Sequence, residues 1–170
     1  MTDILDPIDA DLESFWTHAR NAAKLSPLDS IIPTDSDLLL LPGAFAFGDS
    51  REMADKLADL VVHGNKRATT GYRPSYDYED VPLPVKGELF IVCDGGGRPR
   101  ALIVNDDVIV KPFNEVGEEI SGPEGEGSLE KWIEDHREFF TRECEANGME
   151  FDETADVVVE MFSVVYAPKD

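Results

Sequence analysis

The feature that most constrains this chain is a change of pattern at Gly64, where a helical periodicity ends and strand-like segments begin. The apolar residues before it recur at helical spacing and predict one buried helix face, made of Met53, Leu57, Leu60 and Val61. Gly64 fits the position just beyond the end of a helix. The segment from Arg67 to Tyr72 favours a strand, so the chain passes from a helix into a sheet at this junction.

The same junction is a basic stretch in an otherwise acidic protein. The chain contains 36 acidic and 15 basic residues, yet no acidic residue lies between Asp59 and Asp77. Cations and hydroxyl groups in this window predict a site for an anionic or polar ligand. The alternative is that Gly64 only caps the helix and that the cations only favour its carboxyl end. The residues concerned are Lys66, Arg67, Thr69, Tyr72, Arg73 and Tyr76.

Size and composition indicate one compact domain. The 170 residues are 42% hydrophobic and 30% charged, which is typical of a soluble globular protein with a packed core. No apolar run has the length of a membrane span, and the first residues lack the features of a signal peptide. Cys93 and Cys144 lie in apolar segments and are interpreted as buried thiols of a reducing compartment. We therefore expect a cytoplasmic protein with no membrane partner.

The net charge of -21 limits the partners of the protein. Such a charge repels phosphates over a Debye length of about 8 Å and disfavours binding to long nucleic acids. It leaves room for a local basic site that binds a nucleotide or a short single strand. The partners expected from the sequence are therefore short single-stranded RNA or a modified nucleoside.

The predicted elements run in the order helix, helix, strands, helix, strand, which favours an α+β fold. We expect helices from Pro7 to about residue 24, from Asp49 or Ser50 to Gly64, and from Ser128 to Gly148, with a short helix at 114–119. Strands are expected at 67–72, 87–93, 100–104, 108–110 and 156–166, with a bend or bulge at 105–107. Residues 25–48 are interpreted as a connecting segment, and 76–84 and 122–127 as loops.

Four short runs of sequence, in their order along the chain, indicate a resemblance to a known family. They are Phe47-Gly48-Asp49-Ser50, Gly64-Asn65-Lys66-Arg67-Ala68-Thr69, Pro82-Leu83-Pro84-Val85-Lys86-Gly87-Glu88-Leu89 and Gly125-Glu126-Gly127-Ser128-Leu129-Glu130-Lys131-Trp132. In these runs the chain resembles the bacterial single-domain branch of the ASCH domain family, over roughly residues 40–166. The resemblance implies a PUA-like mixed β-barrel flanked by helices. Residues 1–39 would then be an N-terminal helix and linker packed on an ASCH domain at 40–170.

The resemblance implies two kinds of chemistry. Family members that remove the acetyl group from N4-acetylcytidine use a Lys, a Thr three residues later and a Glu from a later loop. Lys66 and Thr69 match this spacing, and Glu124 and Glu126 both lie in the expected loop. Members described as single-strand ribonucleases use a Lys of the same motif, an aromatic residue and a Ser at the start of the last helix. The matching residues here are Lys66, Tyr72 or Tyr76, and Ser128.

The hypothesis favoured at this point is a hydrolase of single-stranded RNA. Lys66 would stabilise charge on the scissile phosphate, Arg67 or Arg73 would hold a flanking phosphate, and a tyrosine would stack on a base. The alternatives are an N4-acetylcytidine amidohydrolase and a non-catalytic module that binds RNA or a nucleotide. Both enzymatic hypotheses treat Lys66 as an exposed residue whose replacement by Ala abolishes activity with little loss of stability.

Other sites have weaker support in the sequence. The histidines at 18, 63 and 136 show no metal-ligand spacing, and His136 is interpreted as a satisfied residue of an apolar helix face. No cofactor is predicted with certainty, and a divalent cation near the carboxylates is left open. Ser128 has an alternative interpretation as a plain helix cap, and Thr69 as an ordinary strand residue.

Overall fold

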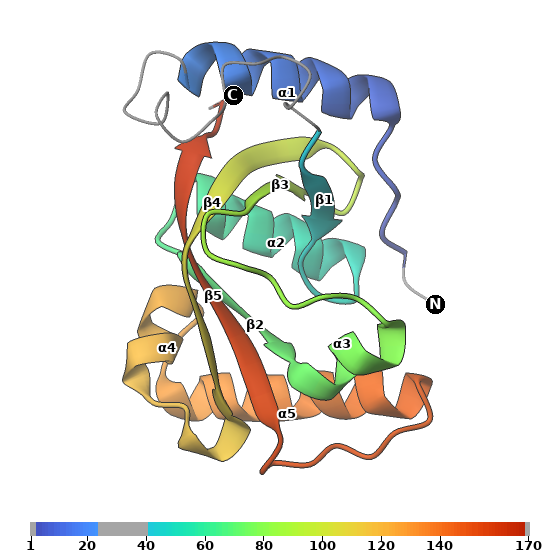
Figure 1. Ribbon diagram of the computed structural model, residues 1–170, viewed down its shortest axis with the longest axis vertical. Coiled ribbons are helices and arrows are strands. Elements are labelled where there is room, and N and C mark those ends of the chain that lie inside the picture. The colour runs from blue at the N-terminus through green and yellow to red at the C-terminus, as the bar shows by residue number, and fades with distance from the viewer. Residues whose placement is uncertain (1–2, 24–40, 169–170) are drawn as a thin grey trace. The chain divides into compact units, whose positions relative to one another are not determined.

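The computed structural model describes residues 3–23 and 41–168 (Figure 1). Its elements are α1 Asp9–Ala23, β1 Gly43–Ala46, α2 Arg51–Val62, β2 Ala68–Tyr72, α3 Arg73–Glu79, β3 Leu89–Cys93, β4 Pro99–Pro112, the 3-10 helix η3 Phe113–Glu115, α4 Glu118–Glu124, α5 Leu129–Ala146 and β5 Asp156–Tyr166. The five strands form one sheet in the order β1-β3-β4-β5-β2. β1 pairs with β3 in parallel, whereas the β3–β4 and β2–β5 pairs are antiparallel. The predicted α+β class with a mixed sheet is confirmed.

The chain divides into two compact units, and each has its own core. One unit contains residues 1–64, 89–104 and 163–170, and the other contains 65–88 and 105–162. In the first unit the apolar stripe of α1 packs against β3 and β4, as the helical spacing predicts. This core consists of Leu12, Phe15, Trp16, Ala19, Ile91, Cys93 and Leu102. The predicted division at residues 39 and 40 stays a prediction, and residues 24–40, with Leu38 to Leu40, lie outside the described part.

The start and end of α2 follow from local chemistry. Ser50 is the N-cap, and its hydroxyl accepts a hydrogen bond from the Met53 amide at 3.2 Å. Of the two starting positions expected from the sequence, Asp49 and Ser50, the structure has Ser50 as the cap. Gly64 follows the C-cap His63, as expected, because a Cβ at this position would lie 2.9 Å from the Leu60 carbonyl oxygen. The glycine is required here by a close approach to the last turn of α2.

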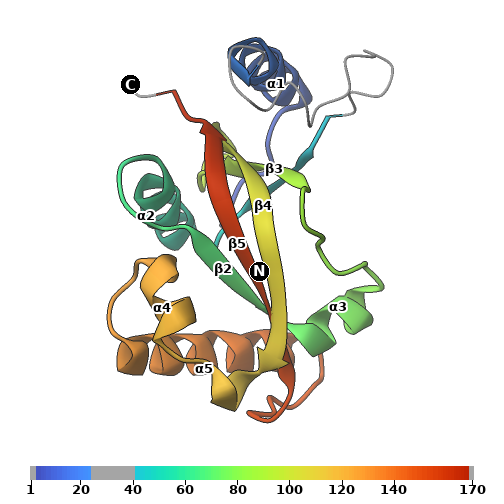
Figure 2. The same cartoon turned by 60° about the vertical axis from the view of Figure 1, so that its left-hand side comes forward.

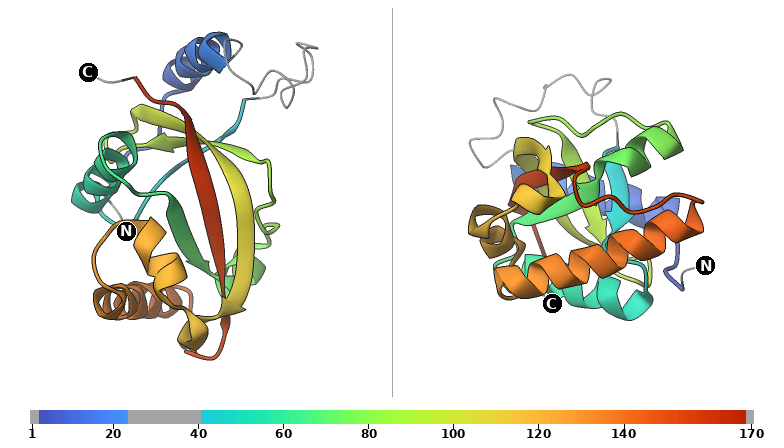
Figure 3. Two further views of the ribbon diagram at one scale, coloured as in Figure 1. Left: turned by 90° about the vertical axis from the view of Figure 1, so that its left-hand side faces the viewer. Right: turned by 90° about the horizontal axis from the view of Figure 1, so that it is seen from below.

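The second unit holds the candidate site. β2 lies beside β5 (Figure 2), and α4 and α5 lie together at one end of β5 (Figure 3). The side chains of β2 and β5 that face α5 form one apolar core with it, because alternate residues of a strand point to the same face. The core residues are Ala68, Tyr72, Phe113, Val116, Ile120, Trp132, Phe140, Cys144, Val157 and Val159.

Five predicted segments differ from the structure. The short helix expected at 114–119 is divided between the end of η3 and the start of α4. The expected connecting segment contains the short strand β1, and the expected loop after Tyr76 overlaps the helix α3, whose Pro74 suits a first helical turn. β4 is one strand through 105–107, and the register shift lies at Val92/Cys93 instead. The expected loop at 122–127 begins as the end of α4, which Gly125 closes with a left-handed φ of 72°.

Candidate functional site

Lys66 lies in the short segment between α2 and β2. Hydrogen bonds of the neighbouring backbone fix this segment: the Arg67 amide donates to the Pro123 carbonyl at 2.6 Å, and the Arg67 carbonyl accepts from the Phe162 amide at 2.9 Å. The loop is thereby attached to both α4 and β5. As a result the Lys66 side chain enters the interior, and only 1% of the residue is exposed.

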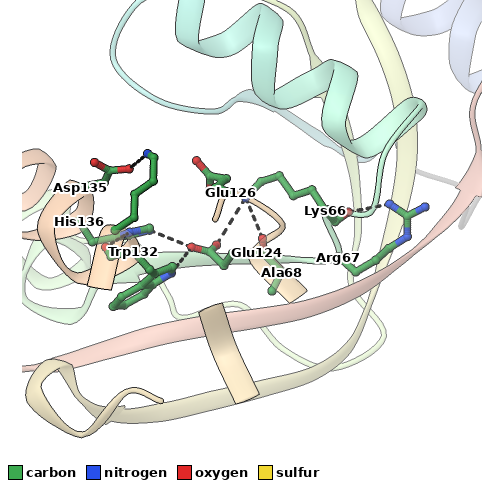
Figure 4. A network of polar contacts seen from close by, with 9 residues as sticks. Lys66, Arg67, Ala68, Glu124, Glu126, Trp132, Asp135 and His136 are labelled. Atoms are coloured by element: carbon green, nitrogen blue, oxygen red, sulfur yellow. Dashed lines mark hydrogen bonds and ion pairs between the residues drawn. The ribbon is translucent and has the colours of Figure 1, made fainter. Parts of the chain in front are cut away.

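The Lys66 ammonium is surrounded by three oxygen acceptors (Figure 4). Its Nζ donates to the Ala68 carbonyl oxygen at 2.9 Å and to Glu126 Oε2 at 3.1 Å, and it lies 3.5 Å from Glu124 Oε1. An ammonium group carries three N–H donors, so these acceptors use its full donor capacity. The lysine predicted to be exposed is therefore buried, and its charge is compensated by two carboxylates.

Glu124 is held on its other side by α5. Its Oε2 accepts from Trp132 Nε1 at 2.5 Å and lies 2.8 Å from His136 Nε2. The His136 ring stacks on the Trp132 ring with 4.0 Å between centroids, and His136 Nδ1 lies 2.8 Å from the Trp132 carbonyl. Burial alone raises the pKa of the Glu124 carboxyl, but the charge of Lys66 and the bonds from His136 and Trp132 outweigh it and hold that pKa below its usual value.

Two local features of the sequence assemble this network, which we call the Lys66 cluster: Lys66, Glu124, Glu126, Trp132 and His136. Trp132 and His136 are four residues apart on α5 and therefore share a helix face. Gly125 separates the two glutamates and lets α4 approach the Lys66 segment, because a Cβ there would lie 2.9 Å from Asn65 Oδ1 and 3.2 Å from the Lys66 backbone.

The two carboxylates of the cluster differ in access to solvent. The side chain of Glu124 is 1% exposed, whereas that of Glu126 is 25% exposed. Glu124 therefore compensates the buried ammonium, and Glu126 is the carboxylate that a solute can reach. With two carboxylates around one ammonium, the positive charge of Lys66 is compensated within the cluster.

The remaining predicted residues near this cluster have structural partners. Ser128 is the N-cap of α5, and its exposed hydroxyl accepts from the Lys131 amide at 3.2 Å. Tyr72 is 2% exposed, and its hydroxyl accepts from the Asp152 amide at 2.9 Å. A tyrosine buried in this way offers no ring face to a base, so the stacking role proposed for Tyr72 is wrong.

The two arginines also have defined contacts. Arg67 Nη1 donates to the Lys66 carbonyl at 2.6 Å, and Arg73 Nη1 donates to Asp77 Oδ1 at 2.7 Å within α3. Both guanidinium groups are half-buried, with part of their surface open to solvent.

Thr69 and Tyr76 belong to a different group of side chains. Thr69 pairs with Glu160 in the antiparallel β2–β5 ladder, and it points to the face opposite that of Ala68 and Tyr72, which lie in the core. Tyr76 lies on this second face, because a Cβ at Gly71 would meet its hydroxyl at 2.8 Å. No hydrogen bond joins Thr69 to either Glu124 or Glu126 among the described residues.

Glu160, Asn105 and the role of Trp132 were not predicted from the sequence. Trp132 and His136 had a usable signal in their spacing of four residues, which places them side by side on a helix. Glu160 and Asn105 had none, because they belong to different strands and meet only through the register of the sheet. Asn105 Nδ2 donates to Glu160 Oε2 at 3.0 Å.

No group of three or more His, Cys, Asp or Glu side chains suited to a metal ion occurs within residues 3–23 and 41–168. In the same part of the chain, no helix has the length and apolar character needed to cross a membrane.

The sheet order and the buried charge cluster beside its last strand define an α+β protein of the PUA-like class. The sequence pattern of the ASCH domain matches residues 43–166, so the chain belongs to the ASCH domain family. A crystal structure of a protein from Enterococcus faecalis V583 is similar with 31% identity and a TM-score of 0.80, covering 92% of this chain and 89% of that one. The ASCH domain from Lactobacillus crispatus JV V101 has 32% identity and a TM-score of 0.72, covering 86% and 95%. No match was found among curated proteins.

Proposed function

We propose that this protein is an RNA- or nucleoside-directed hydrolase that cleaves the amide bond of an N4-acylated cytidine. The observation that carries the proposal is the Lys66 ammonium placed between the carboxylates of Glu124 and Glu126. Membership of the ASCH family, whose domains are generally RNA-binding, supports a ligand of this class. The proposal ranks amide hydrolysis above the RNA cleavage that the sequence favoured.

The chemistry requires a proton acceptor and a group that stabilises negative charge. In the reaction an oxygen atom bonds to the acyl carbon, the C–N bond breaks, and the exocyclic nitrogen leaves as an amino group after it gains a proton. Glu126 is suited to take the proton of the attacking hydroxyl and return it to the nitrogen, because it is the accessible carboxylate. As Glu126 takes up the proton and loses its charge, the Lys66 N–H that it accepted is released and stabilises the charge that develops on the acyl oxygen.

The attacking hydroxyl belongs to water, which Glu126 can deprotonate, or to Thr69, which lies on the opposite face of β2 and requires a different proton acceptor. If Thr69 attacks, its oxygen is acylated first and water then releases the acyl group as a carboxylate. The family resemblance favours Thr69, and its half-buried position on β2 is compatible with access by a solute.

Phosphodiester cleavage has less support from the arrangement of charges. Its transition state gathers negative charge and needs cations that are not already compensated. The Lys66 charge is balanced by two carboxylates, Ser128 serves as a helix cap, and Tyr72 is buried. A neutral acyl group approaches such a cluster without the repulsion that a phosphate meets.

The test is a paired assay with purified full-length protein. N4-acetylcytidine and an end-labelled single-stranded RNA are each incubated with wild type, Glu126→Gln and Glu130→Gln, an exposed control one turn further along the chain. We expect wild type to release cytidine, Glu126→Gln to be slower by about a hundredfold or more, and Glu130→Gln to match wild type. Equal turnover by Glu126→Gln, or cleavage of RNA in place of the nucleoside, would overturn the proposal. Thr69→Ala then separates attack by Thr69 from attack by water.

A further inference from the structure

The face of β2 and β5 opposite the apolar core carries a second group of polar side chains. β2 presents Thr69 and Gly71 on this face, and β5 presents Glu160 directly across from Thr69. Side chains paired across antiparallel strands lie within about 5.5 Å at their Cβ atoms, so Thr69 and Glu160 are neighbours on this face. Both side chains are half-buried.

Asn105 of β4 connects to this group and has an unused acceptor. The residue is 1% exposed, and its Nδ2 donates to Glu160 Oε2 at 3.0 Å and to the Val85 carbonyl at 3.4 Å. Its Oδ1 is buried and has no hydrogen-bond partner. The amide orientation is determined by these contacts, because a flipped amide would place Oδ1 against the Val85 carbonyl.

An unpaired buried acceptor costs about 1–3 kcal/mol, so it marks a position where a donor is accommodated. The free Oδ1 belongs to the same amide whose Nδ2 bonds Glu160. The carboxylate of Glu160 and the amide oxygen of Asn105 together offer two neighbouring acceptors. A ligand that matches them presents two N–H donors or one amino group.

The charges around Glu160 select against anions. Burial raises the pKa of Glu160 above its usual value, and the charge of Glu88 raises it further, against the bond from Asn105. Burial also raises the pKa of Tyr76 to about 12, with further contributions from the charges of Glu160, Glu143, Glu79 and Glu88. A phosphate would be repelled here, whereas a neutral ring with N–H groups would stabilise the Glu160 carboxylate.

Tyr76 provides an aromatic side chain at the edge of the group. Its hydroxyl lies against Gly71, and a Cβ at that glycine would approach it to 2.8 Å. The absence of a side chain at Gly71 is therefore what lets the ring lie over the strand. An aromatic ring beside paired acceptors is a combination that suits a flat heterocycle.

We propose that Glu160, Asn105, Thr69 and Tyr76 form a recognition site for the amino-bearing edge of a neutral nucleobase, with cytosine preferred over uracil. Glu160 and Asn105 accept the two N–H bonds of the amino group of cytosine, Glu160 accepts the single N–H that remains in an N4-acylated cytidine, and Tyr76 contacts the ring. Cytosine carries an amino group at the position where uracil carries an acceptor oxygen. Uracil would therefore place an oxygen atom against the acceptors of Glu160 and Asn105, with no N–H to bond them. The choice of cytosine rests on the proposed function, but the binding site itself does not require hydrolysis.

The test measures binding of free nucleosides by calorimetry. Wild type is titrated with cytidine, with uridine as the matched ligand, and with cytidine 5′-monophosphate. We expect cytidine to bind about tenfold or more tightly than uridine, and the monophosphate to bind more weakly than cytidine. In Glu160→Gln the side chain keeps an acceptor for Asn105, and we expect the preference for cytidine over uridine to fall towards one.

Two further variants address the ring contact and the fold. Tyr76→Leu should weaken the binding of both nucleosides, whereas Tyr78→Leu, an exposed tyrosine of the same helix, should leave both unchanged. Urea unfolding of each variant identifies any loss of folded protein. Equal binding of cytidine and uridine by wild type, or an unchanged preference in folded Glu160→Gln, would overturn the inference.

The outcomes of the two experiments can be told apart. Binding of cytidine that depends on Glu160, without hydrolysis of the acylated nucleoside, would refute the proposed function and leave the recognition site standing. Hydrolysis that depends on Glu126, with KM unchanged in Glu160→Gln, would refute the recognition site and leave the function standing.

Discussion

At the scale of single residues, the pair formed by Lys66 and Glu124 determines how the buried charges are compensated. Both side chains are almost completely buried, with 3.5 Å between Lys66 Nζ and Glu124 Oε1. Removing one member of such a pair leaves an uncompensated charge in the interior. The cost of that charge is much larger than the net contribution of the intact pair.

Lys66→Ala is therefore expected to destabilise the protein by about 3–5 kcal/mol. The free energy of unfolding, measured by urea titration, checks this value. Lys131→Ala is the control, because Lys131 forms an exposed pair with Asp135 and its replacement should change stability by less than about 1 kcal/mol. A loss in Lys66→Ala no larger than that of the control would contradict the compensated pair. Activity lost in Lys66→Ala must accordingly be measured on folded protein.

The lowered pKa of Glu124 predicts a dependence of stability on pH. Its folded-state pKa lies below the unfolded value near 4.5, so the contribution of Glu124 to stability is fully present above pH 4.5 and is lost as pH falls through the folded-state pKa. We expect Glu124→Gln to be less stable than wild type at pH 7 and to lose less stability on acidification. Urea midpoints of both proteins between about pH 3 and 7 test this. If the urea midpoints of the two proteins changed in parallel with pH, the lowered pKa of Glu124 would be contradicted.

At the scale of elements, α5 bears on the two hypotheses for Ser128, a helix cap or a catalytic hydroxyl. Its N-cap Ser128 fixes where the helix begins, and the turns that follow bring Trp132 and His136 to Glu124. The position of these side chains depends on the helix start, whereas the Ser128 hydroxyl itself contacts only the Lys131 amide. If Ser128 acts only as a helix cap, its replacement should change the free energy of unfolding and leave the rate of the reaction unchanged.

Ser128→Ala should lower the free energy of unfolding by about 1 kcal/mol and leave the turnover of N4-acetylcytidine by folded protein unchanged. Ser50→Ala, which removes the equivalent cap of α2, is the matched control and should cost a similar amount. Ser128→Asp should retain the cap and the stability. Turnover of N4-acetylcytidine abolished in Ser128→Ala at unchanged stability would contradict the purely structural role and assign the hydroxyl to catalysis.

The sequence predicted the elements that have strong periodic or capping signals. The junction at Gly64, the strand at 68–72 and the helix that begins after Ser128 follow from apolar spacing and cap residues. The end of α4 was not predicted, because Gly122 and Pro123 disfavour a helix locally and tertiary contacts override this preference. The bond from the Arg67 amide to the Pro123 carbonyl is one such contact.

The candidate site was predictable only in part, because tertiary contacts between distant segments also determine its geometry. Lys66, Glu124 and Glu126 were identified from motifs, but the burial of Lys66 depends on contacts between segments 58 and 60 residues apart. Glu160 pairs with Asn105 across 55 residues, and that contact exists only in the register of the folded sheet. Strand alternation predicts which residues share a face, but it does not predict which strands become neighbours.

At the scale of the whole molecule, the net charge of -21 restricts how the protein meets RNA. Each phosphate that a protein contacts releases counterions, so the dependence of binding on salt counts the phosphates. The Lys66 ammonium is compensated by carboxylates, and the surroundings of Glu160 are acidic. Binding through a base and through few phosphates is therefore expected, in contrast to the multiple contacts of a protein with a basic surface.

This expectation can be measured with a short cytosine-containing single-stranded RNA. A plot of the logarithm of its binding constant against the logarithm of salt concentration should have a slope near -1, measured by fluorescence anisotropy between about 50 and 200 mM salt. Free cytidine, which has no phosphate, is the control and should show a slope near zero. Each phosphate bound to a single strand adds about -0.7 to the slope, so a slope of -3 or steeper would indicate four or more contacts. That result would contradict recognition through one base and would require a basic surface, despite the acidity of the chain as a whole.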